Sequence, residues 1–263
     1  MCISMSEKEG SAMMLMEERR GKIMQELVSM GSVHVSQLAE QFDVTSETIR
    51  KDLAYLEEQG LLVKTHGGAT LKQGAIELSF GVREQENAAA KAVIARTAVE
   101  LTPEGSSVIV CTGSTTLEVA KLLSLRNGLK IFTDSLPVAL CLLQSDNQVF
   151  MFGGQLREQS SSVFGGWTIE QIRQVEADVC FMGTDGFMNI DGPATPSPSD
   201  CFIDREILAH SESRYVLADA TKFRRKSLYK ICDWKDVTAL ITNADADSEL
   251  VERLRQKTEV ICC

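Results

Sequence analysis

The spacing of apolar residues between Thr45 and Gly60 predicts a helix. Ile49, Leu53 and Leu56 recur at intervals of four and three residues, so they share one face that must pack on a core. Threonine and serine at the start of the segment can cap the helix, and the glycine at its end can terminate it. The opposite face is polar, which by itself indicates only a solvated helix surface.

Two shorter helices are predicted upstream. The first covers residues 17–30, where Ile23, Leu27 and Met30 form an apolar stripe before a glycine. The second covers residues 36–42, and a three-residue turn separates it from the next helix. This order of helix, short helix, turn and longer helix is typical of a helix-turn-helix.

Residues 61–71 follow as two short predicted strands joined through Gly67–Gly68. The same residues fit a plain hairpin turn. A hairpin placed directly after three helices instead favours the β-wing of a winged helix-turn-helix, with Lys64 and His66 near its tip. We therefore predict an α+β winged helix-turn-helix domain in residues 14–72.

Further along the chain, apolar runs rich in β-forming residues alternate with helical segments. Strands are predicted at residues 107–112, 130–133, 148–153, 179–184, 215–220, 239–242 and 259–263. Helices are predicted at 88–101, 115–124, 135–144, 168–175, 201–210 and 246–257. The alternation predicts an α/β domain with a largely parallel sheet in residues 91–263. The polar, weakly patterned residues 73–90 are expected to form a linker.

Composition narrows the classes of function. The 263-residue chain carries a net charge of -10, which argues against a bulk basic nucleic-acid binder. No apolar run reaches the ~20 residues of a membrane helix, and residues 1–13 lack a secretory signal, so we expect a cytoplasmic protein. Met13 and Met14 are alternative starts. The eight cysteines form no C-x-x-C pair and there are three histidines, so neither a metal site nor a cofactor is expected.

Any DNA affinity must come from local placement of charge. Residues 14–72 hold seven Lys and Arg against nine Asp and Glu, a net charge of -2. A recognition helix presents base-reading side chains at its N-terminal end, and a wing contacts the backbone at its tip. The candidate DNA contacts are the polar residues at those two places: Thr45, Ser46, Thr48, Arg50, Lys51, Lys64 and His66.

A second candidate site is the segment CTGSTT, residues 111–116, between a predicted strand and a predicted helix. Backbone N–H groups at a helix start, together with a glycine and small hydroxyl residues, can cradle an anion. In an open α/β sheet such a loop lies at the carboxyl end of a strand, where ligands bind. The alternative is a capping box formed by Thr115 and Glu118.

The run TIRKDLAYLEEQGLLVKTHGGA at residues 48–69 resembles the DNA-binding signature of the DeoR family of bacterial transcriptional regulators. Motifs similar to those of the family's sensor domain follow in order: GSTT (113–116), TDSLPVA (133–139), FGGQLR (152–157), FMGTDG (181–186) and ADATKF (218–223). The resemblance implies that the second domain has the sheet fold of ribose-phosphate isomerases and CoA-transferases. It also implies that this domain binds phosphorylated sugars or sugar derivatives.

By this resemblance the GSTT loop would hold a phosphate, Asp185 would hydrogen-bond sugar hydroxyls, and Lys222 would supply a cation. An alternative for Lys222 is a solvated lysine that opens a basic run facing an acidic neighbour. The full set of predicted effector contacts is Thr112, Gly113, Ser114, Thr115, Thr116, Asp134, Gly154, Asp185 and Lys222.

Two positions depart from the family pattern, which often has an acid at Cys111 and an asparagine at Asp134. A carboxylate at Asp134 would repel a phosphate at short range, so the pair indicates an unusual effector or a different placement of charge. Three prolines in residues 191–200 predict a stiff, extended pocket rim. Asp52 is expected to face the protein scaffold, because an acid near DNA phosphates is unfavourable.

The leading hypothesis is a repressor of a carbohydrate-utilisation operon. It would bind double-stranded operator DNA as a homo-oligomer, a dimer or a tetramer, and a phosphorylated sugar would release it. The alternative is a sugar-phosphate isomerase with Asp134, Asp185 or Asp219 as its base, although the winged helix has no role in that chemistry. A third hypothesis is a redox sensor through Cys111, against which we favour a buried thiol.

Overall fold

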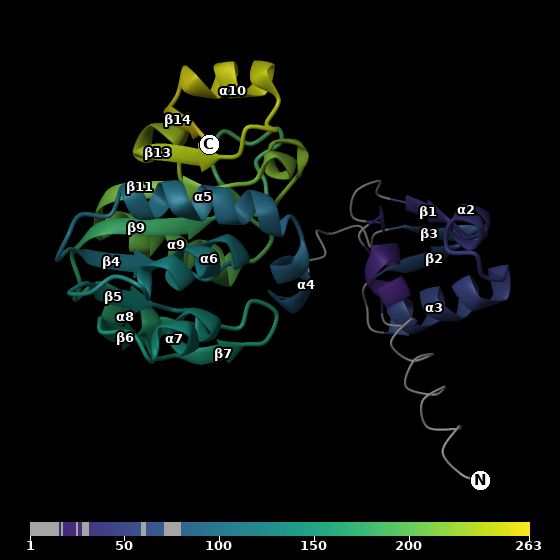
Figure 1. Cartoon of the computed structure of the whole chain (residues 1–263), viewed down its shortest axis with the longest axis horizontal. Coiled ribbons are helices and arrows are strands. Elements are labelled where there is room, and N and C mark those ends of the chain that lie inside the picture. Colours follow the sequence, from purple (N-terminus) through teal and green to yellow (C-terminus); the bar gives the residue numbers. More distant parts are fainter. Residues whose placement is uncertain (1–15, 17, 25, 28–31, 59–61, 71–79) are drawn as a thin grey trace, which may run out of the picture. The chain divides into compact units, whose positions relative to one another are not determined.

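The computed structural model describes residues 16, 18–24, 26–27, 32–58, 62–70 and 80–263. The chain divides into two compact units, Met1–Ile76 and Glu77–Cys263 (Figure 1). The helix ends predicted at Gly31 and Gly60 lie outside the described residues, as does the linker segment 73–79. The predicted domain boundaries at residues 72 and 91 stay predictions.

The N-terminal unit packs its helices around a small apolar core. Residues 18–24 and 26–27 are helical, and α2 (Val35–Gln41) and α3 (Ser46–Glu58) follow. Six side chains on these segments are at most 4% exposed: Ile23, Leu27, Leu38, Ile49, Leu53 and Leu56. The apolar stripes predicted from sequence spacing are therefore the faces that the helices bury.

Three short strands complete this unit as an antiparallel sheet in the order β1-β3-β2. They are β1 (Ser32–His34), β2 (Val63–Thr65) and β3 (Gly68–Thr70). β2 and β3 confirm the predicted wing hairpin, and β1 adds a third strand, which pairs with β3. Gly68 lies inside β3, where a Cβ would be 1.8 Å from the carbonyl oxygen of Val33. This glycine therefore permits the close approach of β1.

The second unit is organised around a seven-stranded parallel sheet in the order β14-β13-β11-β9-β4-β5-β6 (Figure 1). Its strands are β4 (Ser107–Val110), β5 (Lys130–Thr133), β6 (Gln148–Met151), β9 (Ala177–Gly183), β11 (Ser211–Leu217), β13 (Ala239–Thr242) and β14 (Glu259–Cys262). All seven were predicted. From β4 the chain runs outward to β6 and then returns to β9 on the other side of β4. The strand order thus reverses between β4 and β9, which is where open α/β sheets bind ligands.

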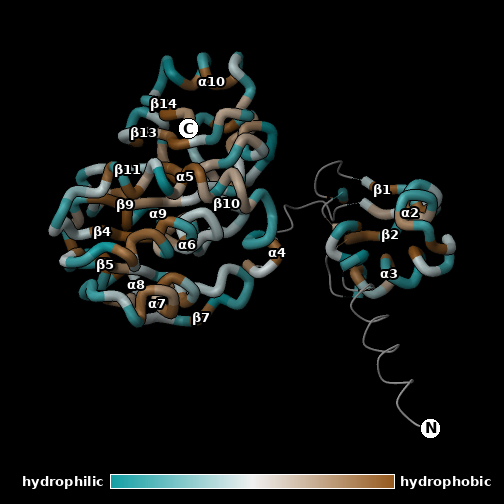
Figure 2. The backbone as a smooth tube through the Cα atoms, in the orientation of Figure 1, coloured by the Kyte–Doolittle hydropathy of each residue, from teal (hydrophilic) through white to brown (hydrophobic). Residues whose placement is uncertain are grey.

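Helices cover both faces of this sheet. One core contains residues of α5 (Ala88–Glu100), α6 (Ser114–Leu123) and α7 (Leu136–Leu142), and the other contains residues of α8 (Gly166–Ile172), α9 (Pro198–Ala209) and α10 (Ser248–Arg255). Successive residues of β4 alternate between them, since Val108 and Val110 belong to the first core and Ile109 to the second. Both sheet faces are buried, which explains the continuous apolar runs in the sequence (Figure 2).

Several short elements were not predicted, because each is too short to show a period. They are α4 (Phe80–Gln85), the hairpin of β7 (Gln155–Arg157) and β8 (Ser162–Phe164), the pair β10 (Ala194–Thr195) and β12 (Tyr229–Lys230), and the 3-10 turns η1 (Ala220–Arg224) and η2 (Trp234–Asp236).

The proline-rich segment also differs from its prediction. Residues 191–200 were expected to be extended throughout, but α9 already begins at Pro198. The Ser197 hydroxyl caps it by accepting the backbone N–H of Asp200 at 3.1 Å, and a proline fits the first turn of a helix because its missing N–H is not needed there. None of the described helices is long and apolar enough to cross a membrane.

Candidate functional site

The N-terminal end of α3 presents polar side chains to solvent. The Thr45 hydroxyl accepts the backbone N–H of Thr48 at 3.2 Å, so Thr45 caps the helix. Arg50 lies 3.7 Å from Glu47, and both side chains are 66% exposed. Such a surface pair holds a guanidinium weakly and leaves it available to another acceptor. The predicted contacts exposed at this end are Thr45, Ser46, Arg50 and Lys51, and Thr48 is partly exposed.

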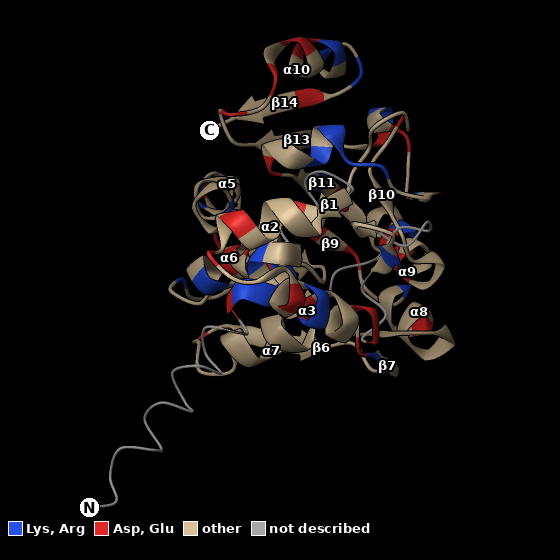
Figure 3. Cartoon of the chain, turned by 90° about the vertical axis from the view of Figure 1, so that its right-hand side faces the viewer, with Lys and Arg blue, Asp and Glu red and all other residues tan. Residues whose placement is uncertain are grey.

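Asp52 lies on the opposite, buried side of α3, as predicted. It is 1% exposed, and its carboxylate pairs with Arg19 at 2.6 Å and with Arg20 at 2.9 Å. Arg20 also lies over the ring of Tyr55, 3.8 Å from its centroid. The two arginines of the first helix therefore fix α3 in place. Figure 3 shows acidic as well as basic residues on α3, in line with the absence of a uniformly basic surface there.

The wing residues Lys64 and His66 are both exposed. The backbone N–H of Lys64 donates to Glu57 at 2.9 Å, and its ammonium group lies 3.2 Å from the same carboxylate. This contact ties β2 to α3 within the N-terminal unit.

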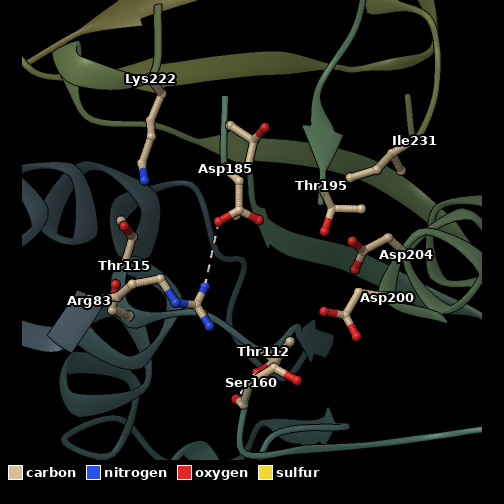
Figure 4. A pocket seen from close by; sticks show the side chains of 14 residues that line it. Arg83, Thr112, Thr115, Ser160, Asp185, Thr195, Asp200, Asp204, Lys222 and Ile231 are labelled. Carbon is tan, nitrogen blue, oxygen red and sulfur yellow. Dashed lines mark hydrogen bonds and ion pairs between the residues drawn. The ribbon is translucent and has the colours of Figure 1, made fainter. Parts of the chain in front are cut away.

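A polar pocket lies at the carboxyl ends of β4, β9 and β11, at the point where the strand order reverses (Figure 4). Segments far apart in the sequence meet there. Its lining residues are Arg83, Thr112, Gly113, Ser114, Thr115, Ser160, Gly183, Thr184, Asp185, Thr195, Asp200, Asp204, Lys222 and Ile231.

The loop that leads from β4 into α6 forms one wall. Gly113 is the N-cap residue with φ of 156°, and a Cβ there would lie 2.9 Å from the Thr116 hydroxyl. No side-chain cap bond is made and the N-cap residue is Gly113, so the alternative interpretation as a capping box of Thr115 and Glu118 was wrong. Because the first turn of a helix has N–H groups without intrahelical partners, Ser114 and Thr115 offer an anion both backbone and hydroxyl donors.

Two cationic side chains reach the same wall. Lys222 comes from η1, and desolvation together with the nearby Arg225 lowers its pKa. Arg83 comes from α4, has a side chain 12% exposed, and lies 3.9 Å from Asp185 (Figure 4). An anion here would meet donors and positive charge in a partly desolvated setting, where both act strongly.

Lys91 secures the helix that carries Arg83. Its ammonium group is buried and donates to the backbone carbonyls of Arg83 and Glu86 at the end of α4. Desolvation, helped by the charge of Lys222, lowers the pKa of Lys91 to about 8. The lysine thus satisfies carbonyls that the short helix leaves open, and it positions Arg83 at the pocket.

The opposite wall is acidic. Asp200 and Asp204 lie four residues apart on α9, so they share one helix face, and both line the pocket. Arg157 pairs with Asp200 at 3.2 Å. No group of three or more His, Cys, Asp or Glu residues suited to a metal ion occurs in the described parts of the chain.

Both units match models of one protein family. Residues 19–74 match the DeoR-like helix-turn-helix domain, and residues 86–244 match the DeoR C terminal sensor domain. The chain belongs to the DeoR family. The described fold, a winged helix-turn-helix followed by an α/β sensor domain, agrees with that membership.

Named relatives of this DeoR protein are repressors. It is 33% identical over 243 residues to a proposed aga operon transcriptional repressor of Escherichia coli O157:H7. That alignment covers 91% of this chain and 90% of the relative. It is 29% identical over 237 residues to the lactose phosphotransferase system repressor of Staphylococcus epidermidis, and the alignment covers 88% of this chain and 93% of the relative. It is 29% identical over 228 residues to the glycerol-3-phosphate regulon repressor of Escherichia coli K12, and the alignment covers 86% of this chain and 90% of the relative.

Among solved structures, ribose 5-phosphate isomerase A of Methanocaldococcus jannaschii is similar in fold, and the alignment covers 52% of this chain and 55% of the isomerase chain. The identity is 16% and the TM-score is 0.40.

Most of the predicted effector contacts of the DeoR sensor domain meet at the pocket, but three do not line it. Thr116 is fully buried and donates to the Gly113 carbonyl at 2.8 Å. Asp134 lies behind the loop and accepts the Thr112 backbone N–H. Gly154 is a packing position, since a Cβ there would be 2.1 Å from the Thr168 hydroxyl.

Sequence analysis missed other lining residues, among them Ser160, Thr195, Asp200 and Asp204. The four-residue spacing of the two aspartates was a usable signal, but residues 191–200 were expected to form an extended loop. Arg83 stood in a segment expected to be a linker. Its placement depends on Lys91 in the next helix, and no local pattern shows that contact.

Cys111 is a buried thiol, the interpretation favoured from sequence. It is fully buried, and desolvation raises its pKa well above the ordinary value, with Asp204 and Asp134 adding to the effect. The reactive form of a cysteine is the thiolate, which this environment disfavours. The hypothesis of a redox sensor at Cys111 therefore loses its physical basis.

Proposed function

We propose that this DeoR-family protein is a repressor of a carbohydrate-utilisation operon, and that a phosphorylated sugar releases it from operator DNA. The observation that carries the proposal is the pocket at the carboxyl end of β4. There the first turn of α6 and two cations, Arg83 and Lys222, converge on one wall. The same chain carries a DeoR-like helix-turn-helix domain. A sensor and a DNA reader in one chain are what a ligand-controlled repressor needs.

The DNA contacts in this proposal are the exposed residues of α3 and the wing. Arg50 and Lys51 would reach bases or phosphates in the major groove, while Lys64 and His66 would contact the backbone. Their exposure and the weak hold of Glu47 on Arg50 support these roles. Thr45, Ser46 and Thr48 would add hydroxyl contacts at the helix N-terminus, where N–H groups favour a phosphate.

The effector in this proposal places its phosphate at Ser114, Thr115 and Lys222. Hydroxyl and N–H donors together with an ammonium group suit a phosphate, which is a compact dianion. Asp185, at the end of β9, would accept hydrogen bonds from sugar hydroxyls while its partner Arg83 faces the phosphate. Two relatives are named for phosphate-linked regulons, a lactose phosphotransferase system and a glycerol-3-phosphate regulon. Those names agree with a phosphorylated effector.

Release would operate through a homo-oligomer. Two recognition helices must lie ~34–36 Å apart to read successive major grooves, so a ligand that favours another spacing weakens DNA binding. Exposed apolar side chains of the sensor unit support self-association: Leu140 on α7, Leu143 at its C-terminal end, and Phe150 and Met151 on β6, the edge strand of the sheet. An unpaired apolar edge strand invites a second copy of the chain.

A gel-shift titration on the DNA upstream of the protein's own gene tests the proposal. The protein should form a discrete complex that competitor DNA of random sequence does not remove. A panel of hexose and pentose phosphates should contain at least one compound that dissolves the complex, while the unphosphorylated sugars should not. A sequence-specific complex that no sugar phosphate alters would leave a DNA-binding protein without the proposed effector.

A further inference from the structure

Asp204 is a buried carboxylate without a partner, and it faces the pocket. It is 8% exposed and belongs to the pocket lining. Within the described residues, no hydrogen bond or ion pair is formed by its side chain, although it lies on a well-packed helix, α9. A carboxyl group that is shielded from most of the water and left unpaired is costly, so such a group in a pocket indicates a missing ligand contact.

The ionisable residues that act on Asp204 are all acidic. Desolvation raises its pKa well above the ordinary value, and the carboxylates of Asp134, Asp200 and Asp185 raise it further. Arg157 does not line the pocket, and its guanidinium lies 3.2 Å from Asp200. No cation is among the causes of this shift, so the described protein groups give the ionised form of Asp204 no counter-charge.

The two walls of the pocket have opposite character (Figure 4). Lys222, Thr115 and Arg83 lie on one side, and Asp200 and Asp204 lie on the other. A ligand that carries only a phosphate matches the first wall and leaves the second unmatched. A ligand with a phosphate at one end and a cation at the other matches both.

We infer that the effector is a phosphorylated amino sugar, whose protonated amine is bound by Asp204 beside Asp200. This inference rests on the proposed function, because it assigns the phosphate to the Ser114 and Lys222 wall. An ammonium group donates three hydrogen bonds and supplies the counter-charge that the ionised form of Asp204 lacks. A sugar hydroxyl donates one hydrogen bond and supplies no counter-charge.

A bound metal ion accounts less well for Asp204. Divalent cations need several oxygen or nitrogen ligands around one point. The described residues contain no cluster of three or more His, Cys, Asp or Glu side chains that could supply them. A single ammonium group needs only the two carboxylates that α9 provides.

The test compares ligands that differ at one position. Titration calorimetry on the full-length protein uses glucosamine 6-phosphate against glucose 6-phosphate, and galactosamine 6-phosphate against galactose 6-phosphate. At least one amine should bind about tenfold or more tightly than its hydroxyl counterpart, because a hydrogen bond between two charged groups is the stronger kind. Asp204→Asn should abolish this preference while the affinity for the hydroxyl compound changes by less than about threefold. Asp191→Asn, at an exposed aspartate paired with Lys257, is the matched control and should change neither affinity.

Each outcome decides between the claims. Equal binding of amine and hydroxyl forms, or a preference that survives in Asp204→Asn, overturns this inference and leaves the proposed function intact. Failure of every sugar phosphate to bind overturns the proposed function and this inference with it. If Asp204→Asn does not fold, the comparison of the two ligand forms on the unaltered protein decides the matter.

Discussion

The carboxylate of Asp134 accepts the backbone N–H of Thr112 at 2.8 Å, behind the loop that forms the pocket wall. Asp134 is 2% exposed, and desolvation together with the charge of Asp200 raises its pKa from 3.8 to about 7. The residue therefore positions the loop while carrying a proton that an exposed aspartate would lose. The sequence predicts this carboxylate against the phosphate, but in the structure it lies behind the backbone of the loop.

Replacing Asp134 by asparagine should stabilise the protein at neutral and alkaline pH. The asparagine oxygen can still accept the Thr112 N–H, and the buried charge is gone. Between pH about 4 and 7 the folded wild type keeps a proton that the unfolded chain has released, so its free energy of unfolding falls as pH rises. The gain from Asp134→Asn should be full above pH about 7, on the order of 1–4 kcal/mol, and should vanish toward pH 4.

Thermal unfolding of both proteins from pH 4 to 9 measures this effect. A constant difference in melting temperature at all pH values would show that Asp134 does not titrate in this window. A loss of stability at pH 8 would show that the ionised carboxylate is stabilising.

The buried pairing of Asp52 with Arg19 and Arg20 should hold the DNA-binding unit together. Asp52→Asn leaves two arginines without their counter-charge, and breaking a buried pair costs about 3–5 kcal/mol. Hydrogen exchange should therefore show lost protection in peptides covering α3. Glu47→Gln, at an exposed pair, should cost less than about 1 kcal/mol.

The two tryptophans, Trp167 and Trp234, give an internal control for that experiment, since both lie in the sensor unit. Their fluorescence should report the same unfolding midpoint for Asp52→Asn and for the wild type. Unaltered protection of α3 in Asp52→Asn would mean that the ion pairs contribute little to its packing.

Arg50 should carry sequence discrimination if its guanidinium contacts a guanine. Arg50→Ala should then cost ~1–3 kcal/mol of binding free energy, confined to one base pair of each half-site. The affinity of both proteins for operators substituted at single base pairs distinguishes a guanine contact from a phosphate contact. A uniform loss on every operator, with a shallower salt dependence, would instead assign Arg50 to a phosphate.

Lys222 and Lys226 belong to the same basic run, yet only Lys222 lines the pocket. Lys222→Met should weaken the binding of the releasing sugar phosphate about tenfold or more, because a charge-assisted bond to the phosphate is lost. Lys226→Met is the matched control and should leave that affinity unchanged. Equal effects of both substitutions would favour a general electrostatic contribution, as expected of a solvated basic face.

Seven sheet strands were predictable because a sheet buried on both faces leaves continuous apolar runs in the sequence, as in residues 107–110. The helix containing Ile49, Leu53 and Leu56 was predictable from its buried stripe alone. These signals are local, so a single sequence contains them.

The features that sequence analysis missed depend on contacts between distant residues. β1 is three residues long and is a strand because β3 pairs with it. α4 is six residues long, and Lys91 of the next helix caps its end. Asp204 owes its character to Asp200 on the same helix and to residues from two other segments, Asp134 and Asp185. No spacing along the chain reveals that shared environment.

The most direct test of the account is release of operator DNA measured by fluorescence anisotropy, with full-length protein and a labelled fragment from upstream of its gene. Increasing sugar phosphate should lower the anisotropy of the wild-type complex to that of free DNA. Lys222→Met should bind the same DNA with unchanged affinity and should need about tenfold or more ligand for release. Wild-type anisotropy that stays constant at saturating concentrations of every sugar phosphate would contradict the account.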